Sequence, residues 1–208
     1  MPFGTKIYYT LNGDDPDKDD TLYNGKIKID LIEEQTNVIP LKVIIYYNDE
    51  YSQIYQRTYI LDKDIENRFD LSVISITSDS YNLYDYYNGL LVGGATLDEN
   101  RKTDPESTTG NYNNRDNEWY RDCHVNMFTP QGESIIDGEY EIMCAGGGSA
   151  QIFNTKSLKI KINNENKINF RYNEELSKQN LINEYNSLEF RTGGQDIIRN
   201  KHKIECHK

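Results

Sequence analysis

The 208-residue chain has little of several residue types, and each shortage excludes a class of protein. Its three cysteines, an odd number, cannot form a closed disulfide framework. Its 23 lysines and arginines against 34 acidic residues leave a net charge of −11. That balance argues against nucleic acid as a partner, because neutralising phosphates requires clustered cations. No apolar run approaches the length of a membrane-spanning helix, so we expect no membrane span.

The few cysteines leave two interpretations open. Cys123 and Cys144 lie on candidate neighbouring strands, where they either pair or remain free buried thiols. Cys206 lies near His202 and His207, but the paired-cysteine spacing of a zinc site is missing. We therefore interpret this end as a polar tail and predict no metal site.

The first residues show no signal-peptide pattern. Met1-Pro2-Phe3-Gly4 leads directly into a strand pattern, without the charged and apolar regions of a signal peptide. Two interpretations follow: the protein is intracellular, or its true start lies upstream.

Tyrosine is abundant, with 17 residues, and residues 5–61 predict an all-β region. Alternating or continuous apolar residues predict strands near residues 5–11, 27–31, 38–47 and 52–61. Residues 62–68 are charged and predict a linker. Five tyrosines either form a carbohydrate-stacking face or fill a small sandwich: Tyr8, Tyr46, Tyr47, Tyr51 and Tyr55.

An acidic loop lies between the first two predicted strands. Residues 14–20 carry five aspartates but lack the glycine and final glutamate of an EF-hand loop. We interpret the loop as a solvated turn.

Residues 4–61 resemble the chitobiase/β-hexosaminidase C-terminal domain family. The segments that carry the resemblance are GTKIYYTLNGDDPDKDDTLYNGKIKI and VIPLKVIIYYNDEYSQIYQRTYIL. The resemblance implies an immunoglobulin-like β-sandwich among extracellular modules. The leading strands of that family are missing here, so we expect a partial sandwich with an exposed sheet edge.

The rest of the chain mixes strands and helices. We predict a buried strand at residues 71–76, a short helix at 78–84 and a helix at 174–185. Residues 95–118 are polar and predict a mobile insertion.

The strongest local signal is a lysine behind a glycine-rich loop. Gly146-Gly147-Gly148-Ser149 precedes the alternating strand pattern of residues 156–162, which places Lys156 on the apolar side. Such a lysine either holds a nucleotide phosphate or runs its stem along apolar surface toward solvent.

Four segments in order resemble the spore-coat protein H (CotH) kinase family over residues 69 to about 198. They are FDLSVISITSDSYNLYDYYNGLLVGG, NEWYRDCHVNMFTPQGE, EYEIMCAGGGSAQIFNTKSLKIKI and SLEFRTGGQD. The resemblance implies an atypical protein kinase at the spore surface or outside the cell. Such a kinase uses ATP with Mg²⁺ or Mn²⁺ to phosphorylate serines of spore-coat or surface proteins.

Phosphoryl transfer needs groups that hold the phosphates, carboxylates that hold the metal, and a carboxylate that orients the attacking hydroxyl. The candidates for nucleotide binding are Lys156, Gly147, Gly148, Ser149 and Arg191. A glutamate of the following helix would pair with the lysine; the candidates are Glu174, Glu175 and Glu184.

The other two requirements have no candidate, because the family carries its catalytic and metal-binding aspartates further downstream. Asp196 matches an aspartate that we interpret as structural. We therefore predict no catalytic residue and no metal ligand, and the residues present require no cofactor.

The predicted fold class is mainly β with some α. A partial immunoglobulin-like β-sandwich (1–61) and a linker (62–68) precede the N-terminal half of an atypical kinase-like α+β domain (69–208). Two functions follow: an inactive N-terminal fragment of a CotH-like kinase, or a non-catalytic extracellular or surface adhesion module. The partners are a protein substrate or surface protein, with carbohydrate as an alternative ligand.

Overall fold

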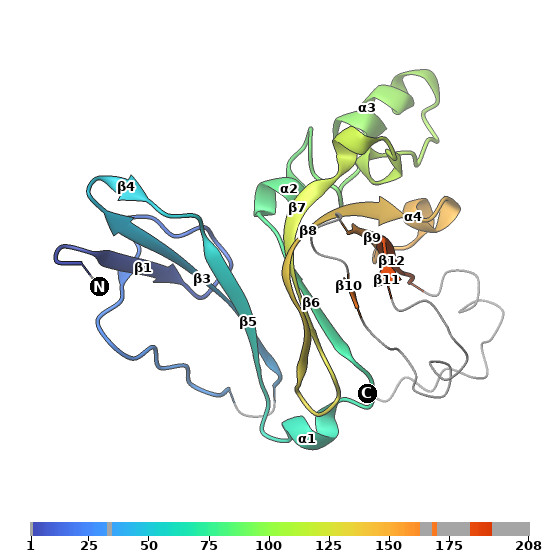
Figure 1. The fold of residues 1–208 in the computed structure, drawn as a ribbon. Coiled ribbons are helices and arrows are strands. Elements are labelled where there is room, and N and C mark those ends of the chain that lie inside the picture. The colour runs from blue at the N-terminus through green and yellow to red at the C-terminus, as the bar shows by residue number, and fades with distance from the viewer. Residues whose placement is uncertain (1, 33–34, 163–167, 170–183, 193–208) are drawn as a thin grey trace. The chain divides into compact units, whose positions relative to one another are not determined.

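The computed structural model describes residues 2–32, 35–162, 168–169 and 184–192, and it is mainly β (Figure 1). Two five-stranded antiparallel sheets account for most of it, so the mainly-β prediction is confirmed. The strands are β1 (Lys6–Thr10), β2 (Thr21–Leu22), β3 (Asn37–Tyr47), β4 (Glu50–Tyr51), β5 (Tyr55–Leu61), β6 (Val73–Thr77), β7 (Arg121–Phe128), β8 (Ser134–Ala145), β9 (Ser157–Lys161), β10 (Ile168–Asn169), β11 (Glu184–Tyr185) and β12 (Ser187–Phe190).

The described helices are short. They are α1 (Ile65–Arg68), α2 (Ser80–Tyr84), α3 (Gly94–Thr103), α4 (Gly148–Ile152) and the 3₁₀ turns η1 (Asn111–Asn113) and η2 (Asn117–Trp119). None of the helices in the described part of the chain has the length and apolar character needed to cross a membrane. The predicted helix at 78–84 is confirmed by α2, and α1 lies within the predicted linker.

The first sheet has β3 at its centre, between β1 on one side and β4 and β5 on the other. Because successive side chains of a strand point to opposite faces of the sheet, the apolar run of β3 supplies apolar side chains to both faces. The β3–β4 hairpin turns at Asn48 and Asp49, whose positive φ angles of 51° and 63° suit the type I′ turn of a two-residue hairpin. The predicted strand at 27–31 is wrong: those residues form no strand, and Leu31 is exposed. Without a partner strand, the alternating apolar side chains of this segment have no sheet face to complete, and they do not form a strand.

The second sheet has the strand order β12-β9-β8-β7-β6. The chain divides into two compact units. Unit 1 holds residues 1–79 and 123–139, and unit 2 holds residues 80–122 and the chain from 140 onward. Strands β7 and β8 each run from one unit into the other.

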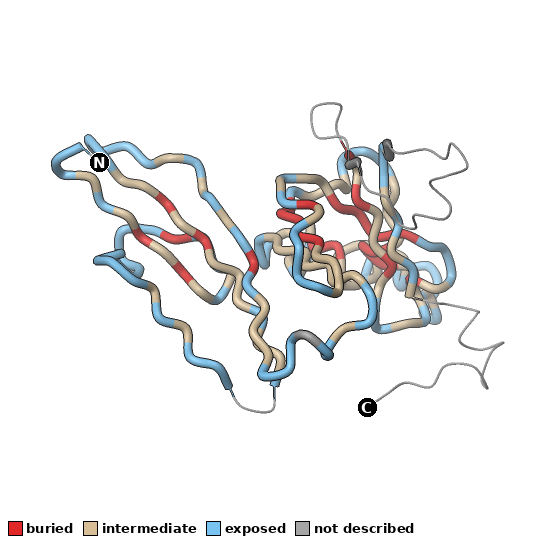
Figure 2. Tube along the Cα trace, turned by 60° about the horizontal axis from the view of Figure 1, so that its bottom comes forward, coloured by how far each residue is buried: buried red, intermediate tan, exposed pale blue. Residues whose placement is uncertain are grey.

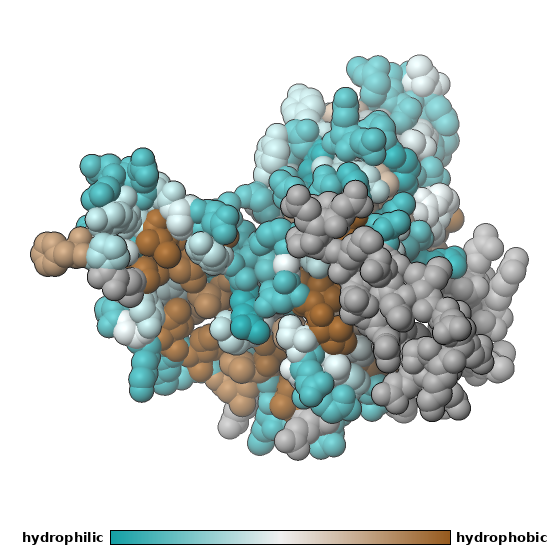
Figure 3. Space-filling model, in the orientation of Figure 1, coloured by the Kyte–Doolittle hydropathy of each residue, from teal (hydrophilic) through white to brown (hydrophobic). Residues whose placement is uncertain are grey.

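Burial differs between the two sheets. Figure 2 shows isolated buried positions in β1 and β3 and longer buried runs in β7 and β8. Five consecutive residues of β7, Cys123–Met127, are buried, so this strand is covered on both faces. Apolar residues also lie at the surface of the first sheet (Figure 3).

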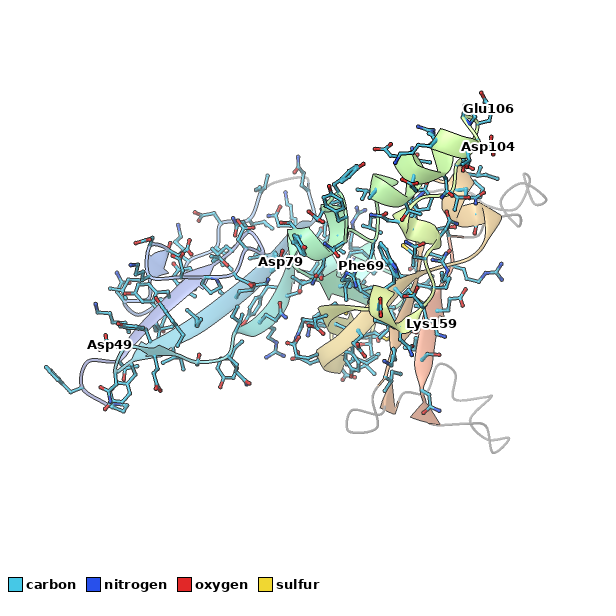
Figure 4. The ribbon with its side chains drawn as sticks, turned by 90° about the horizontal axis from the view of Figure 1, so that it is seen from above. Asp49, Phe69, Asp79, Asp104, Glu106 and Lys159 are labelled. Carbon is cyan, nitrogen blue, oxygen red and sulfur yellow. The ribbon has the colours of Figure 1, made fainter. Side chains whose placement is uncertain are left out.

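The polar segment 95–118 in unit 2 is folded around one asparagine, contrary to the prediction of a mobile insertion. Asn111 is 1% exposed; its Oδ1 accepts a bond from the Thr96 amide and its Nδ2 donates to the Tyr86 carbonyl. Gly94, with φ +56°, passes so close that a Cβ there would lie 2.3 Å from both the Asn111 amide nitrogen and the Tyr86 oxygen. Asp104 and Glu106 lie just beyond the C-terminal end of α3 (Figure 4). The hydrogen bonds of this buried side-chain amide thus hold the polar segment in place.

Several predictions concern residues outside the described part of the chain. Most of the predicted helix 174–185 lies there, and its last two residues form β11, antiparallel to β10. Glu174, Glu175 and Asp196 also lie there, as do Cys206 and its neighbouring histidines.

Candidate functional site

The lysine behind the glycine loop is hydrogen-bonded to main-chain carbonyls within unit 2. Nζ of Lys156 donates to the Ala150 oxygen at 2.6 Å and to the Phe153 oxygen at 2.7 Å. These carbonyls belong to the C-terminal end of α4, where a cation satisfies oxygens that lack intrahelical partners. Lys156 Nζ also lies 4.1 Å from the centre of the Tyr112 ring. Burial lowers the pKa of Lys156.

The glycine loop itself is held by Arg115. One guanidinium nitrogen of Arg115 donates to the Gly146 carbonyl at 2.6 Å, and the other donates to the Tyr112 and Asn114 carbonyls. Burial lowers the pKa of Arg115. The φ of Gly146 is +81°, and α4 begins two residues later. The space around Gly147 and Gly148 is open.

The structure thus brings Lys156, Gly147, Gly148 and Ser149 together, and β12 ends nearby. Pairing of Phe190 with Leu158 places Arg191 beside the start of β9, but its side chain is exposed. Among the described contacts none joins Arg191 to Lys156 or to the loop.

Cys123 and Cys144, the two cysteines in the described part of the chain, are buried, and neither forms a disulfide. Sγ of Cys144 donates to the Leu90 carbonyl at 3.0 Å, and burial raises its pKa to about 11. Of the two alternatives, buried thiols without a disulfide are therefore observed.

The acidic loop and the tyrosines are used mainly within the first sheet. Asp15 forms an ion pair with Lys42, which is 4% exposed, at 2.6 Å. The side chains of Asp17 and Asp20 accept bonds from backbone amides of the loop itself. These contacts favour the solvated turn. The strand register places Tyr8, Tyr46 and Tyr51 on one face and Tyr47 and Tyr55 on the other, so the five tyrosines form no single stacking face.

Unit 1 contains a charged cluster that the sequence pattern did not indicate. His124 on β7 is 6% exposed, and each of its ring nitrogens meets a carboxylate of β8. Nδ1 lies 2.7 Å from Glu139 Oε1, and Nε2 lies 2.9 Å from Asp137 Oδ1. Because a carboxylate only accepts hydrogen bonds, both contacts are made when the ring carries both protons.

The charges around His124 agree with that protonation state. Burial by itself would lower the pKa of His124, but the bonds and charges of Glu139 and Asp137 outweigh it and raise the pKa above 6.5. Burial would likewise raise the pKa of Glu139, but bonds from His124 and Gln56, with the charge of Lys42, hold it below 4.5. Arg57 of β5 lies 3.7 Å from Asp137.

This cluster is one end of a contact between β5 and the strands β6, β7 and β8. Gln56 Nε2 lies 3.2 Å from Glu139, and the Thr58 amide donates to Asn126 Oδ1 at 2.9 Å. The Thr58 hydroxyl meets the Ser75 hydroxyl at 2.9 Å. His124 and Asn126 alternate along β7 and would be expected to face solvent, but both are buried, and Asn126 is bonded to β5.

At its other end the same contact opens into a pocket of about 760 Å³ within unit 1. Six of the residues that line it are apolar: Ile60, Ile65, Phe69, Val73, Phe128 and Pro130. None of these six side chains is fully buried. Phe69 follows α1, and Phe128 ends β7 opposite Val73. The volume is in the range of small-molecule sites.

The pocket was missed because its residues come from four separated parts of the sequence. The one local signal is the two-residue spacing of Thr58 and Ile60 on one strand and of Asn126 and Phe128 on another. This spacing places a polar and an apolar side chain on the same face of each strand.

No family model, curated protein or solved structure matches the chain.

Proposed function

We propose that the chain is a non-catalytic binding module whose ligand site is the pocket of unit 1. The observation that carries this proposal is the set of half-exposed apolar side chains around a 760 Å³ pocket. A ligand there would remove this apolar surface from water, which stabilises a complex by about 25 cal/mol for each Å². The site is also supported on its polar side by the bonds of Thr58 and Asn126.

The proposal includes a fold for each part of the chain. Residues 4–61 form a partial immunoglobulin-like sandwich of the chitobiase C-terminal type, and residues 69 to about 198 are the N-terminal part of a CotH-like kinase fold used for binding. A surface or extracellular location follows from both resemblances. The partner class is a surface protein or a smaller ligand, carbohydrate included.

A CotH-like kinase that uses ATP and Mg²⁺ is the second candidate. The open space around Gly147 and Gly148 favours it, since amides there are accessible to a phosphate. A phosphate on Lys156 would, however, compete with the carbonyl oxygens of Ala150 and Phe153. We therefore rank this candidate below the binding module.

The test uses 8-anilinonaphthalene-1-sulfonate, whose fluorescence rises when it binds apolar sites. Ile65→Trp in α1 and Gln131→Trp in the turn between β7 and β8 would fill the pocket. Ile152→Trp, at an exposed position of α4, is the matched control. We expect both filling variants to lose the saturable part of the signal and the control to keep it. Equal signals in all three variants, with unchanged β-sheet circular dichroism, would refute the site.

A further inference from the structure

Arg57 is the one residue with a formal charge among the twelve described residues that line the pocket. Its guanidinium is half-exposed, and among the described residues its contact is the 3.7 Å ion pair with Asp137, too long for a hydrogen bond. Arg115 and Arg121 of unit 2, by contrast, each donate to three carbonyl oxygens. The donors of Arg57 therefore remain available to a ligand.

The carboxylate beside Arg57 is already engaged elsewhere. Oδ1 of Asp137 accepts from the buried ring of His124 at 2.9 Å, so only its second oxygen faces Arg57. An exposed pair of this length contributes little stability. A ligand carboxylate could form the two parallel bonds that the guanidinium geometry favours, without removing Asp137 from His124.

The remaining walls define the rest of the ligand. The apolar side chains of Ile60, Phe69 and Phe128 offer no charge. The other polar side chains of the lining are uncharged: Thr58, Tyr59, Thr129 and Gln131. A second charge on the ligand would lose its hydration without a partner there. The ligand that satisfies both parts of the pocket has one anionic group and an apolar body.

We infer that the pocket of unit 1 binds a small amphipathic anion, with its carboxylate or sulfonate on Arg57 and its apolar body against Ile60 and Phe128. This inference rests on the proposed function. It also makes a prediction that opposes the overall electrostatics, because a net charge of −11 attracts cations and repels anions.

The experiment compares three ligands with the same chain and different head groups: dodecanoate, dodecanol and dodecylammonium, each below its micelle concentration. The measurement is how well each ligand displaces 8-anilinonaphthalene-1-sulfonate from the full chain at physiological salt. We expect dodecanoate to bind about tenfold more tightly than dodecanol, with dodecylammonium the weakest, because a bond to a charged group contributes about a factor of ten.

The variant Arg57→Gln should remove the advantage of dodecanoate over dodecanol and leave the affinity for dodecanol unchanged. Arg101→Gln, which alters an exposed arginine of unit 2 bonded to the Ser107 carbonyl, is the matched control and should change neither.

Two failures are distinguishable. If dodecylammonium binds as tightly as dodecanoate, or if Arg57→Gln keeps the dodecanoate advantage, the anion inference is overturned while the pocket remains a binding site. If none of the three ligands competes, or if Ile65→Trp and Gln131→Trp leave the competition unchanged, the proposed function fails and the inference fails with it.

Discussion

Two cations in unit 1 and two in unit 2 are satisfied in different ways. In unit 1 Lys42 meets Asp15, and His124 meets Asp137 and Glu139. In unit 2 Arg115 and Lys156 meet main-chain carbonyl oxygens, and Lys156 also lies over a tyrosine ring. Main-chain carbonyls do not titrate, whereas histidine changes its charge near neutrality. The stability of unit 1 should therefore depend on pH near neutrality, and that of unit 2 should not.

The largest expected effect is in unit 2. Arg115→Ala removes three hydrogen bonds to the carbonyls of Tyr112, Asn114 and Gly146 and should lower the free energy of unfolding by about 3 kcal/mol. Urea unfolding, followed by hydrogen exchange of amides in each unit, measures it. Arg101→Ala, which removes one bond from an exposed arginine, is the control and should cost less than 1 kcal/mol. A loss that is equal at pH 6 and pH 8 is expected, and a pH-dependent loss would contradict the comparison.

His124→Gln should have the next largest effect, and it should depend on pH. Because the folded pKa of His124 lies above 6.5, its stabilisation is complete below that pH and is lost as the pH rises through the folded value. Near pH 6 we expect a loss of about 2 kcal/mol for two charge-assisted bonds, shrinking at higher pH.

The acid side of this profile belongs to Glu139. Its folded pKa lies below 4.5, so its stabilisation is present above 4.5 and is lost as the pH falls through the folded value. Unit 1 should be most stable between about pH 4.5 and 6.5, and Glu139→Gln should flatten the acid limb. A wild-type chain whose urea midpoint stays constant from pH 4 to 8 would count against the His124 cluster.

A smaller effect is expected for Lys156→Ala. If the lysine is structural, the variant should lose about 1 kcal/mol and leave nucleotide binding unchanged from wild type. Lys159→Ala on the same strand is the control. Incubation with labelled ATP, Mg²⁺ and a serine-rich basic protein should transfer no phosphate, and transfer that disappears in Lys156→Ala would restore the kinase candidate.

The smallest effect concerns thiol chemistry. With a pKa of about 11, roughly one Cys144 in a thousand is ionised at pH 8, because the fraction falls tenfold for each pH unit below the pKa. Reaction with a disulfide reagent should be much slower than for a free peptide thiol. Reaction at the peptide rate would show that the region around Leu90 opens readily.

The sequence predicted most strands from apolar alternation, residues 27–31 being an exception, and failed where polar side chains are buried. Ile160 and Ile162 alternate with lysines and lie inside, as expected. Asn111 and His124 are buried through specific hydrogen bonds to distant residues, which no local pattern encodes. Lys156 was placed near its loop by its spacing, but its bonds to Ala150 and Phe153 depend on how α4 ends.

The most direct test locates ligand binding by NMR of isoleucine methyl groups in the full chain. Ile60 and Ile65 report on the pocket of unit 1, and Ile152 reports on the loop beside Lys156. With dodecanoate, we predict saturable shifts of Ile60 and Ile65 and none of Ile152. With ATP and Mg²⁺, we predict no shift of any of the three. A shift of Ile152 with ATP, together with unchanged Ile60 and Ile65 in dodecanoate, would contradict the account.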